Sequence, residues 1–281
     1  MTDNMSPADQ LGFCTVRIAC TNDGVQESVG TGFFLAFPVE GRTTIPVIIT
    51  NRHVIKGATI GTFQLTEIDE NGSPRIGTFT NISVEKFENM WLSHPDEQVD
   101  LCMMPMASLL RAANDQGKRF FYKSVGKDLI ATSETMSELS SLEEVVMVGY
   151  PVGIWDRANN MPIFRRGITA SRPDLDYCGR KEFMIDVACF PGSSGSPVML
   201  FNIGGYVTKD GKSMLGGTRI KLLGVLYAAP QYAVDGHLEI VPVPTTAIAI
   251  SRSHVPVNLG LVIKAERLLE FEQFFPELQK S

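Results

Sequence analysis

The sequence predicts an all-β protein built as two lobes, with a helix at the C-terminal end. Most of the chain consists of short apolar runs separated by turn residues, and the clearest turns are Asn71-Gly72 and Asp210-Gly211. At 281 residues the chain is long enough for two compact lobes with a substantial core. These two observations together indicate a two-lobed β fold.

The predicted elements follow one another in a simple order. Residues 1–105 should form the first lobe and residues 143–281 the second. Between them, residues 106–142 hold a helix-prone stretch at 106–113 and a polar stretch at 132–139. We interpret this part as a connection between the lobes with a short helix. It is either a solvated crossover packed on the lobes or a functional lid or linker.

The end of the second lobe has the spacing of an amphipathic helix over residues 261–278. The apolar positions of this segment are Leu261, Ala265, Leu268, Leu269, Phe271, Phe274 and Phe275. We expect the helix to dock on the second lobe, and binding to a partner is the alternative.

Composition excludes several classes of partner. The 25 basic and 31 acidic residues leave a net charge of −6, which argues against nucleic acid or an anionic membrane as the main partner. No stretch reaches the roughly 20 apolar residues of a membrane span, and the N-terminus has no pattern of a secretion signal. The five cysteines include no C-x-x-C pair, so we expect reduced thiols in a cytoplasmic protein, with no cofactor and no metal.

One turn carries most of the chemical information. Pro191-Gly192-Ser193-Ser194-Gly195-Ser196-Pro197 lies between apolar runs at residues 183–188 and 198–201, which places Ser194 on a tight turn between two strands. Such a turn can expose a hydroxyl beside converging backbone N–H groups, as acyl-transfer chemistry requires. By itself the motif is more typical of a plain hairpin loop.

A serine nucleophile needs a base, and the base needs a carboxylate that orients it. Among the four histidines, only His53 directly follows a strongly strand-like run, residues 45–50. Asp100 opens a fresh apolar run and could face a cleft, whereas Asp96 is the alternative partner. Taken singly, His53 could be a structural histidine and Asp100 a turn residue. Together, the order His53, Asp100, Ser194 is the order found in chymotrypsin.

Further strings agree with this order. They are Gly30-Thr31-Gly32-Phe33-Phe34-Leu35, Thr50-Asn51-Arg52-His53-Val54, Val148-Gly149-Tyr150-Pro151-Val152-Gly153, Arg166-Gly167-Ile168-Thr169-Ala170-Ser171, Asp186-Val187-Ala188 and Leu223-Gly224-Val225. Through them the chain resembles the trypsin-like serine peptidases, most of all the bacterial Deg (high-temperature-requirement) protease domain without a PDZ domain. The resemblance implies a chymotrypsin-like double barrel, that is, two six-stranded Greek-key β-barrels with the helix at the end.

The resemblance also implies roles. Ser194 would be the nucleophile, His53 the general base and acid, and Asp100 the residue that orients His53, in a serine endopeptidase that forms an acyl-enzyme with polypeptide substrates. The turn Gly192-Ser193-Ser194 would form the oxyanion hole. Two positions depart from the family: Ser196 stands where glycine is usual and needs an ordinary φ or some strain, and Ser193 replaces a longer Asn or Asp.

Specificity is less directly readable from the sequence. The implied substrate-binding residues are Ala188, Cys189, Phe190, Leu226, Tyr227 and Ala228. No carboxylate stands at Ala188, so we expect a small or medium apolar side chain before the cleaved bond rather than Lys or Arg. Two alternatives remain open: a catalytically weak peptide-binding module, and a protease of a bacterial stress or defence system that a regulatory partner activates. A homo-oligomer is open as well.

Overall fold

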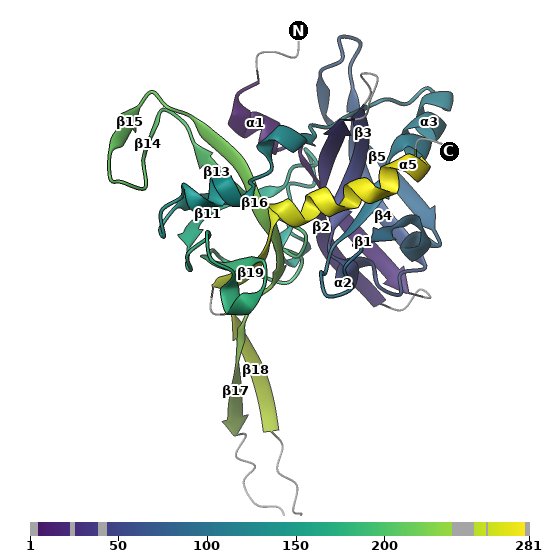
Figure 1. Ribbon diagram of the computed structural model, residues 1–281. Coiled ribbons are helices and arrows are strands. Elements are labelled where there is room, and N and C mark those ends of the chain that lie inside the picture. The colour runs from purple at the N-terminus through teal and green to yellow at the C-terminus, as the bar shows by residue number, and fades with distance from the viewer. Residues whose placement is uncertain (1–4, 23–25, 39–43, 238–249, 257, 279–281) are drawn as a thin grey trace, which may run out of the picture.

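The computed structural model describes residues 5–22, 26–38, 44–237, 250–256 and 258–278 (Figure 1). It is mostly β, and its strands form two lobes that lie side by side. Within the described residues, no helix combines the length and the apolar character needed to cross a membrane.

The first lobe is a nine-stranded sheet. Its main path runs in the order β5-β4-β1-β2-β3-β7-β6, with β8 paired to β4 and β9 to β2. The strands are β1 (Thr15–Asn22), β2 (Gln26–Pro38), β3 (Thr44–Thr50), β4 (Ile60–Ile68), β5 (Pro74–Glu85), β6 (Leu92–Ser93), β7 (Cys102–Pro105), β8 (Phe120–Phe121) and β9 (Val125–Gly126). Short helices flank them: α1 (Pro7–Leu11), α2 (Arg52–Ile55), the 3-10 helix η1 (Phe87–Met90) and α3 (Ala107–Asp115).

This sheet differs from the expected closed six-stranded barrel, because its path ends at β5 and β6 without pairing the two. The reason is geometric. β6 has only 2 residues, and both of them already pair with β7. The segment between the lobes also contributes β8 and β9 to this sheet, and therefore helps to build the first lobe.

The second lobe is a closed barrel in the order β10-β11-β12-β19-β16-β13, which confirms the expected six-stranded barrel there. Its strands are β10 (Glu144–Gly149), β11 (Ile163–Thr169), β12 (Glu182–Asp186), β13 (Pro197–Asn202), β16 (Arg219–Ala228) and β19 (Leu259–Lys264). The shorter elements before and within it are η2 (Lys127–Leu129), α4 (Ser133–Ser137), η3 (Pro151–Gly153) and η4 (Tyr177–Gly179). Burial alternates along β11, whereas β13 and the central part of β16 are buried on both faces.

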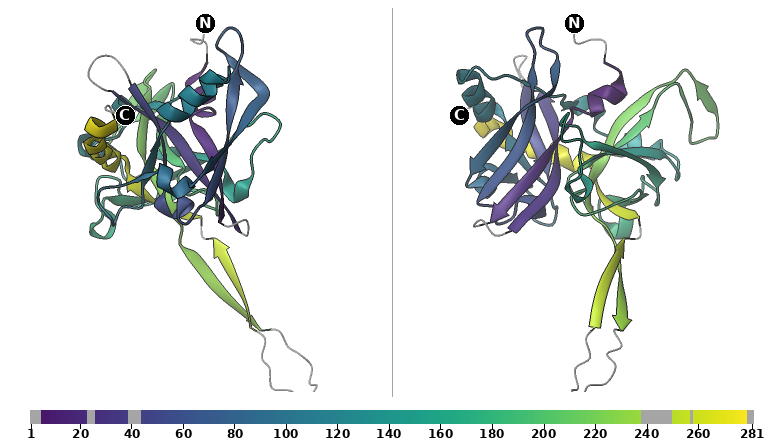
Figure 2. Two further views of the ribbon diagram at one scale, coloured as in Figure 1. Left: turned by 90° about the vertical axis from the view of Figure 1, so that its right-hand side faces the viewer. Right: turned by 180° about the vertical axis from the view of Figure 1, so that it is seen from behind.

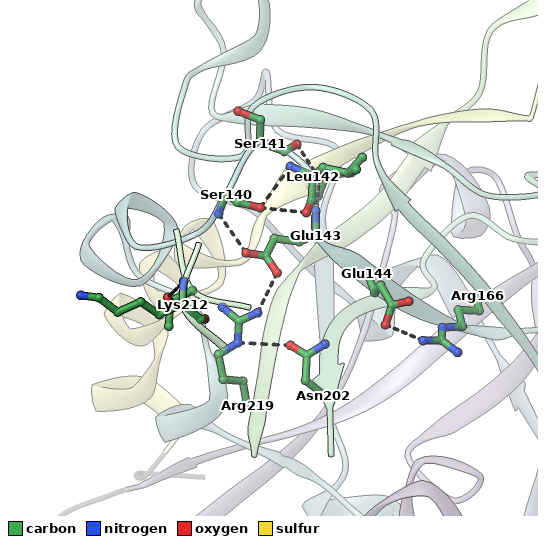
Figure 3. A network of polar contacts seen from close by, with 11 residues as sticks. Ser140, Ser141, Leu142, Glu143, Glu144, Arg166, Asn202, Lys212 and Arg219 are labelled. Atoms are coloured by element: carbon green, nitrogen blue, oxygen red, sulfur yellow. Dashed lines mark hydrogen bonds and ion pairs between the residues drawn. The ribbon is translucent and has the colours of Figure 1, made fainter. Parts of the chain in front are cut away.

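A buried ion pair braces one end of this barrel (Figure 3). The carboxylate of Glu143, which is only 5% exposed, accepts a 2.7 Å hydrogen bond from Nη2 of Arg219. The Nε of Arg219 donates to Asn202 at 3.2 Å, and the backbone N–H of Ser140 donates to Glu143 at 2.9 Å. The network therefore ties the loop before β10 to β13 and β16.

Two hairpins project from the barrel (Figures 1 and 2). One pairs β14 (Gly205–Val207) with β15 (Ser213–Leu215), and the other pairs β17 (Gln231–His237) with β18 (Ile250–Pro256). Each is a two-stranded sheet of its own. The second hairpin begins just after β16, and both views in Figure 2 show it extending away from the lobes.

The C-terminal segment corrects the expected helix over residues 261–278. Its first part is the barrel strand β19, which is followed by the 3-10 helix η5 (Ala265–Phe274) and the short α5 (Phe275–Leu278). The segment crosses to the first lobe instead of staying on the second (Figure 1). There Phe275 packs on Phe37 with ring centroids 4.8 Å apart, and Phe271 packs on His94 at 5.2 Å. Burial of these rings against the first lobe explains the direction of the segment.

Candidate active site

His53 is held at the point where a buried strand turns into a short helix. β3 ends at Thr50, and α2 begins at Arg52. Thr50 and the residue that links the two elements, Asn51, are fully buried. The side-chain amide of Asn51 donates a 2.7 Å hydrogen bond to the backbone oxygen of Asp100. The strand end that carries the histidine is therefore fastened to the segment that carries the aspartate.

The Asp100 carboxylate contacts His53 with both of its oxygens. The ring Nδ1 of His53 lies 2.5 Å from Oδ2, and the backbone N–H of His53 donates to Oδ1 at 3.1 Å. A carboxylate on Nδ1 favours the tautomer that carries its proton there, which leaves the lone pair on Nε2. The His53 side chain is 46% exposed and Asp100 23%, so the free ring edge is open to solvent.

Asp96, the alternative partner, is engaged elsewhere. Its carboxylate accepts hydrogen bonds from the backbone N–H of Gln98 at 2.9 Å and from Nη2 of Arg267 at 2.7 Å. These contacts, led by the one from Gln98, lower the pKa of Asp96 below its usual value. Of the two aspartates, the structure therefore places Asp100 on His53.

Ser194 lies on a loop of the second lobe that meets the first lobe at Thr31. The backbone N–H of Thr31 donates to the Ser194 carbonyl at 2.8 Å, and the Thr31 carbonyl accepts the Thr50 hydroxyl at 2.7 Å. Thr50 is three residues before His53, so Thr31 connects the two predicted site segments. Among the described contacts, no hydrogen bond joins Ser194 Oγ to the ring of His53. Catalytic hydrogen bonds are often long before substrate binds.

Glycine is required where this loop approaches Thr31. Gly195 has φ +85°, and a Cβ there would lie 1.9 Å from the Thr31 carbonyl oxygen. Gly192 also has φ +85°, and its carbonyl accepts the Thr31 hydroxyl at 3.0 Å. Both glycines thus allow a backbone path that brings the serine loop onto the first lobe.

The same loop leaves two backbone donors free. The carbonyl of Pro191 accepts the N–H of Val152 at 2.5 Å, and the N–H of Ser193 donates to Phe190 at 3.0 Å. In the part of the chain that the structure describes, the N–H groups of Gly192 and Ser194 have no acceptor. The C=O of Pro191 and the N–H of Gly192 belong to the same trans peptide group and point in opposite directions. Because the C=O faces Val152, the Gly192 N–H points away from Val152. The two unpaired donors are thus two residues apart, and one of them is the backbone N–H of Ser194 itself.

Ser196 fits its unusual position without backbone strain. It is not among the described non-glycine residues with positive φ. Its side chain is fully buried, and space for it comes from Gly149, since a Cβ on Gly149 would lie 2.2 Å from Ser196 Oγ. The Oγ has no hydrogen-bond partner among the described residues, so this position lacks one bond that a buried hydroxyl usually makes.

The six predicted substrate-binding residues lie on two segments, the approach to the serine loop and the end of β16. Cys189 and Leu226 are buried, and Phe190 is 39% exposed. The Tyr227 hydroxyl donates to Glu182 at 2.9 Å, and burial, followed by this bond, raises the pKa of Tyr227 to about 12. Ala188 and Ala228 are half-buried. The Tyr227 hydroxyl therefore already has a hydrogen-bond partner, the Glu182 carboxylate.

A cavity of about 430 Å³ borders the histidine. Its lining residues are Arg52, His53, Ile55, Lys56, Glu88, Ser93 and Asp100. No group of His, Cys, Asp and Glu side chains in the described part of the chain is arranged to hold a metal ion.

One residue of the site was not predicted. Arg165, on β11, donates from Nη1 to the Ala188 carbonyl at 2.8 Å and to Ser193 Oγ at 2.7 Å. In the structure, burial alternates along β11 and Arg165 lies on the more buried face, although the apolar residues Phe164 and Ile168 stand on the exposed face. Nothing in the sequence pattern indicates that the loop before Ser194 is its partner.

Comparison with known proteins adds structural relatives. The HtrA-type protease AlgW with a tripeptide is similar over 95% of this chain, with 15% identity and a TM-score of 0.48, and this chain covers 61% of its length. The active form of the Rv3671c protease from M. tuberculosis has 17% identity and a TM-score of 0.45, with 96% of this chain and 84% of that chain covered. For Deg5 the values are 16% and 0.43, with 80% and 88% covered. No curated protein matches the sequence.

The family is shown by the sequence itself. The family model described as trypsin-like peptidase domain matches residues 30–207, which is more than half of the chain. The matched range contains the three residues that the sequence singled out, His53, Asp100 and Ser194. The prediction of this family is confirmed. The chain belongs to the trypsin-like peptidase domain family.

Proposed function

We propose that this protein is a serine endopeptidase in which Ser194, His53 and Asp100 form the catalytic triad. The observation that carries the proposal is the contact of both Asp100 oxygens with His53, at 2.5 and 3.1 Å. This contact leaves Nε2 as the basic atom, which is the atom a serine hydroxyl needs. Family membership and the turn that carries Ser194 support the same assignment.

In the acylation step, Ser194 Oγ attacks the carbonyl carbon of the peptide bond while His53 Nε2 takes the hydroxyl proton. An O–C bond forms, and the carbonyl oxygen becomes an oxyanion. The tetrahedral intermediate then breaks its C–N bond, and His53 returns the proton to the leaving amine. Asp100 stabilises the imidazolium between the two transfers. The products are the free amine and an acyl ester on Ser194.

Deacylation repeats the steps of acylation with a water molecule in place of the serine hydroxyl. His53 removes a proton from the water molecule, whose oxygen attacks the ester carbon. Collapse of the second tetrahedral intermediate breaks the bond to Ser194 Oγ, which recovers its proton from His53. The second product is a carboxylic acid, and the enzyme returns to its starting state.

The unpaired N–H groups of Gly192 and Ser194 are suited to hold the oxyanion in both steps. Removal of one such donor lowers turnover roughly 100- to 1000-fold in other acyl-transfer enzymes. The substrates we propose are extended polypeptides, with no strong selectivity for Lys or Arg before the cleaved bond. No acidic side chain occurs at Ala188, Cys189 or Phe190 to attract such a cation.

A fluorophosphonate probe tests the proposal directly, because its phosphorus is attacked by an activated serine and fluoride leaves. Purified protein should be labelled, Ser194→Ala should not be labelled, and His53→Ala should be labelled far more slowly. Ser193→Ala removes the neighbouring serine; it should be labelled more slowly than wild type but still on Ser194, and mass spectrometry of the labelled peptide would locate the probe. Absence of labelling in the purified protein would contradict the proposal of a serine peptidase that is active by itself. Labelling that appears only with added lysate would favour a partner-activated protease.

A further inference from the structure

The two neighbouring arginines of β11, Arg165 and Arg166, have opposite environments. Along Ile163–Thr169, odd-numbered residues are buried or half-buried and even-numbered residues are exposed. Arg165 therefore faces the barrel end beneath the serine loop. Arg166 faces solvent, with a side chain that is 70% exposed and paired with Glu144. The two arginines form a natural pair of test and control.

Arg165 bridges the two ends of the loop that precedes the nucleophile. A single nitrogen, Nη1, donates to the Ala188 carbonyl at 2.8 Å and to Ser193 Oγ at 2.7 Å. Ser193 is 1% exposed, and its Oγ also accepts the N–H of Phe190 at 3.3 Å. The guanidinium thus closes the loop from Ala188 to Ser193 on the side away from solvent.

This arrangement costs stability. The Nε and Nη2 atoms of Arg165 are buried and have no hydrogen-bond partner among the described residues. No described carboxylate forms an ion pair with Arg165, and burial lowers its pKa to about 10. Buried polar atoms are usually paired, and a buried charge without a counter-charge is unfavourable. A methionine of similar length would avoid this cost.

We propose that Arg165 is a positioning residue. Through Ser193 it holds the serine loop in the conformation in which the N–H groups of Gly192 and Ser194 can bind the oxyanion. Ser193 lies between the two residues whose N–H groups are unpaired, Gly192 and Ser194. Fixing its side chain below the loop fixes the directions of both neighbouring N–H groups. The longer Asn or Asp implied by the family at this position is replaced here by a serine and a buried arginine. The proposal rests on the serine peptidase function above.

The first test compares Arg165→Met with Arg166→Met, using the rate of fluorophosphonate labelling and the thermal unfolding midpoint. Arg165→Met should lower the maximal labelling rate roughly 100-fold, the scale for loss of one oxyanion donor, while the probe concentration at half-maximal rate changes less than about twofold. Its unfolding midpoint should be unchanged or higher, because a buried unpaired charge is removed. Arg166→Met should label at the wild-type rate.

Slow labelling combined with unreduced stability distinguishes positioning from a purely structural role, in which rate and stability would fall together. Equal labelling rates for Arg165→Met and wild type would overturn the inference and leave the peptidase function intact. Failure of wild type to label would instead overturn the function. The two failures are therefore separable.

A double-mutant cycle tests whether Arg165 acts through its hydrogen bond to Ser193. It uses Ser193→Ala as well as Arg165→Met. Ser193→Ala should slow labelling, and Arg165→Met combined with Ser193→Ala should be little slower than Arg165→Met. Strictly multiplicative effects would contradict action through Ser193. An unchanged rate in Ser193→Ala would contradict it as well.

Discussion

The backbone N–H of Thr31, in the first lobe, donates a 2.8 Å hydrogen bond to the carbonyl of Ser194, in the second. The Thr31 hydroxyl donates to Gly192 at 3.0 Å and accepts the N–H of Tyr150 at 3.1 Å. One buried residue of β2 thus contacts the loop on both sides of Ser193. The geometry of the proposed oxyanion hole consequently depends on how the lobes meet.

Thr31→Val should weaken both the fold and the activity. Valine keeps the shape of the side chain but removes the hydroxyl, which leaves the Gly192 carbonyl and the Tyr150 N–H without their partner. Unsatisfied buried groups cost about 1–3 kcal/mol each, so urea unfolding should show a loss of that order. Thr44→Val, at an exposed position on β3, is the control and should change the free energy of unfolding little. Equal losses in the two variants would contradict the bonding role of Thr31.

Asp100→Asn should lower turnover on the order of 10,000-fold, the effect of the same change in the triad template. An asparagine can donate to Nδ1 and thereby favour the wrong tautomer of His53. Asp96→Asn should keep near-normal turnover, because Asp96 contacts Arg267 and not His53. Hydrolysis of a peptide selected from a cleavage library would measure both. A larger loss in Asp96→Asn than in Asp100→Asn would reverse the assignment.

Gly195→Ala should destabilise the protein far more than Gly211→Ala. Both glycines have positive φ, +85° and +82°, so both substitutions carry the backbone cost of about 1–2 kcal/mol. Only at Gly195 would the new Cβ collide, 1.9 Å from the Thr31 oxygen, whereas nothing lies within 4 Å at Gly211. We expect a loss of more than about 4 kcal/mol at Gly195, or failure to fold. Similar unfolding midpoints for the two variants would show that the loop can retreat from Thr31.

Asp174 should make stability depend on pH in the acid range. Its hydrogen bond from Arg172, the largest cause, lowers its pKa to about 2. Because the folded pKa lies below the unfolded value of about 4, the carboxylate stabilises the fold above pH 4, and this contribution is lost as the pH falls from about 4 to about 2. The difference in unfolding midpoint between wild type and Asp174→Asn should follow this course. Salt at about 1 M should shrink the difference, and a difference independent of pH would contradict the prediction.

The sequence predicted the contact between His53 and Asp100 better than the shape of the lobes around it. His53, Asp100 and the serine turn could be found because short strings of particular residue types stand at recognisable places in the chain. Arg165 could not be found in this way, because the apolar residues Phe164 and Ile168 of β11 lie on its exposed face, and no pattern along one strand indicates which distant loop covers the other face. Contacts across 28 positions, such as Arg165 to Ser193, are set by the closure of the barrel.

The two errors of fold prediction have a related cause. Strand signals in the first lobe predicted strands correctly, but barrel closure depends on whether the edge strands are long enough to pair, and β6 is not. The apolar spacing at the C-terminal end indicated a helical segment, yet its first residues form β19. The partner of the remaining segment lies in the first lobe, and local periodicity contains no information about that choice.

The crossing of the C-terminal segment should make the two lobes unfold as one cooperative unit. β19 closes the barrel, and the residues that follow it at once, from Ala265 onward, bury Phe271 and Phe275 in a cluster that also contains Phe33 and Phe37 of the first lobe. Neither lobe can therefore lose its packing without exposing apolar surface of the other. Heat should melt both lobes in a single calorimetric transition, and the proposed active centre should be lost in that same transition.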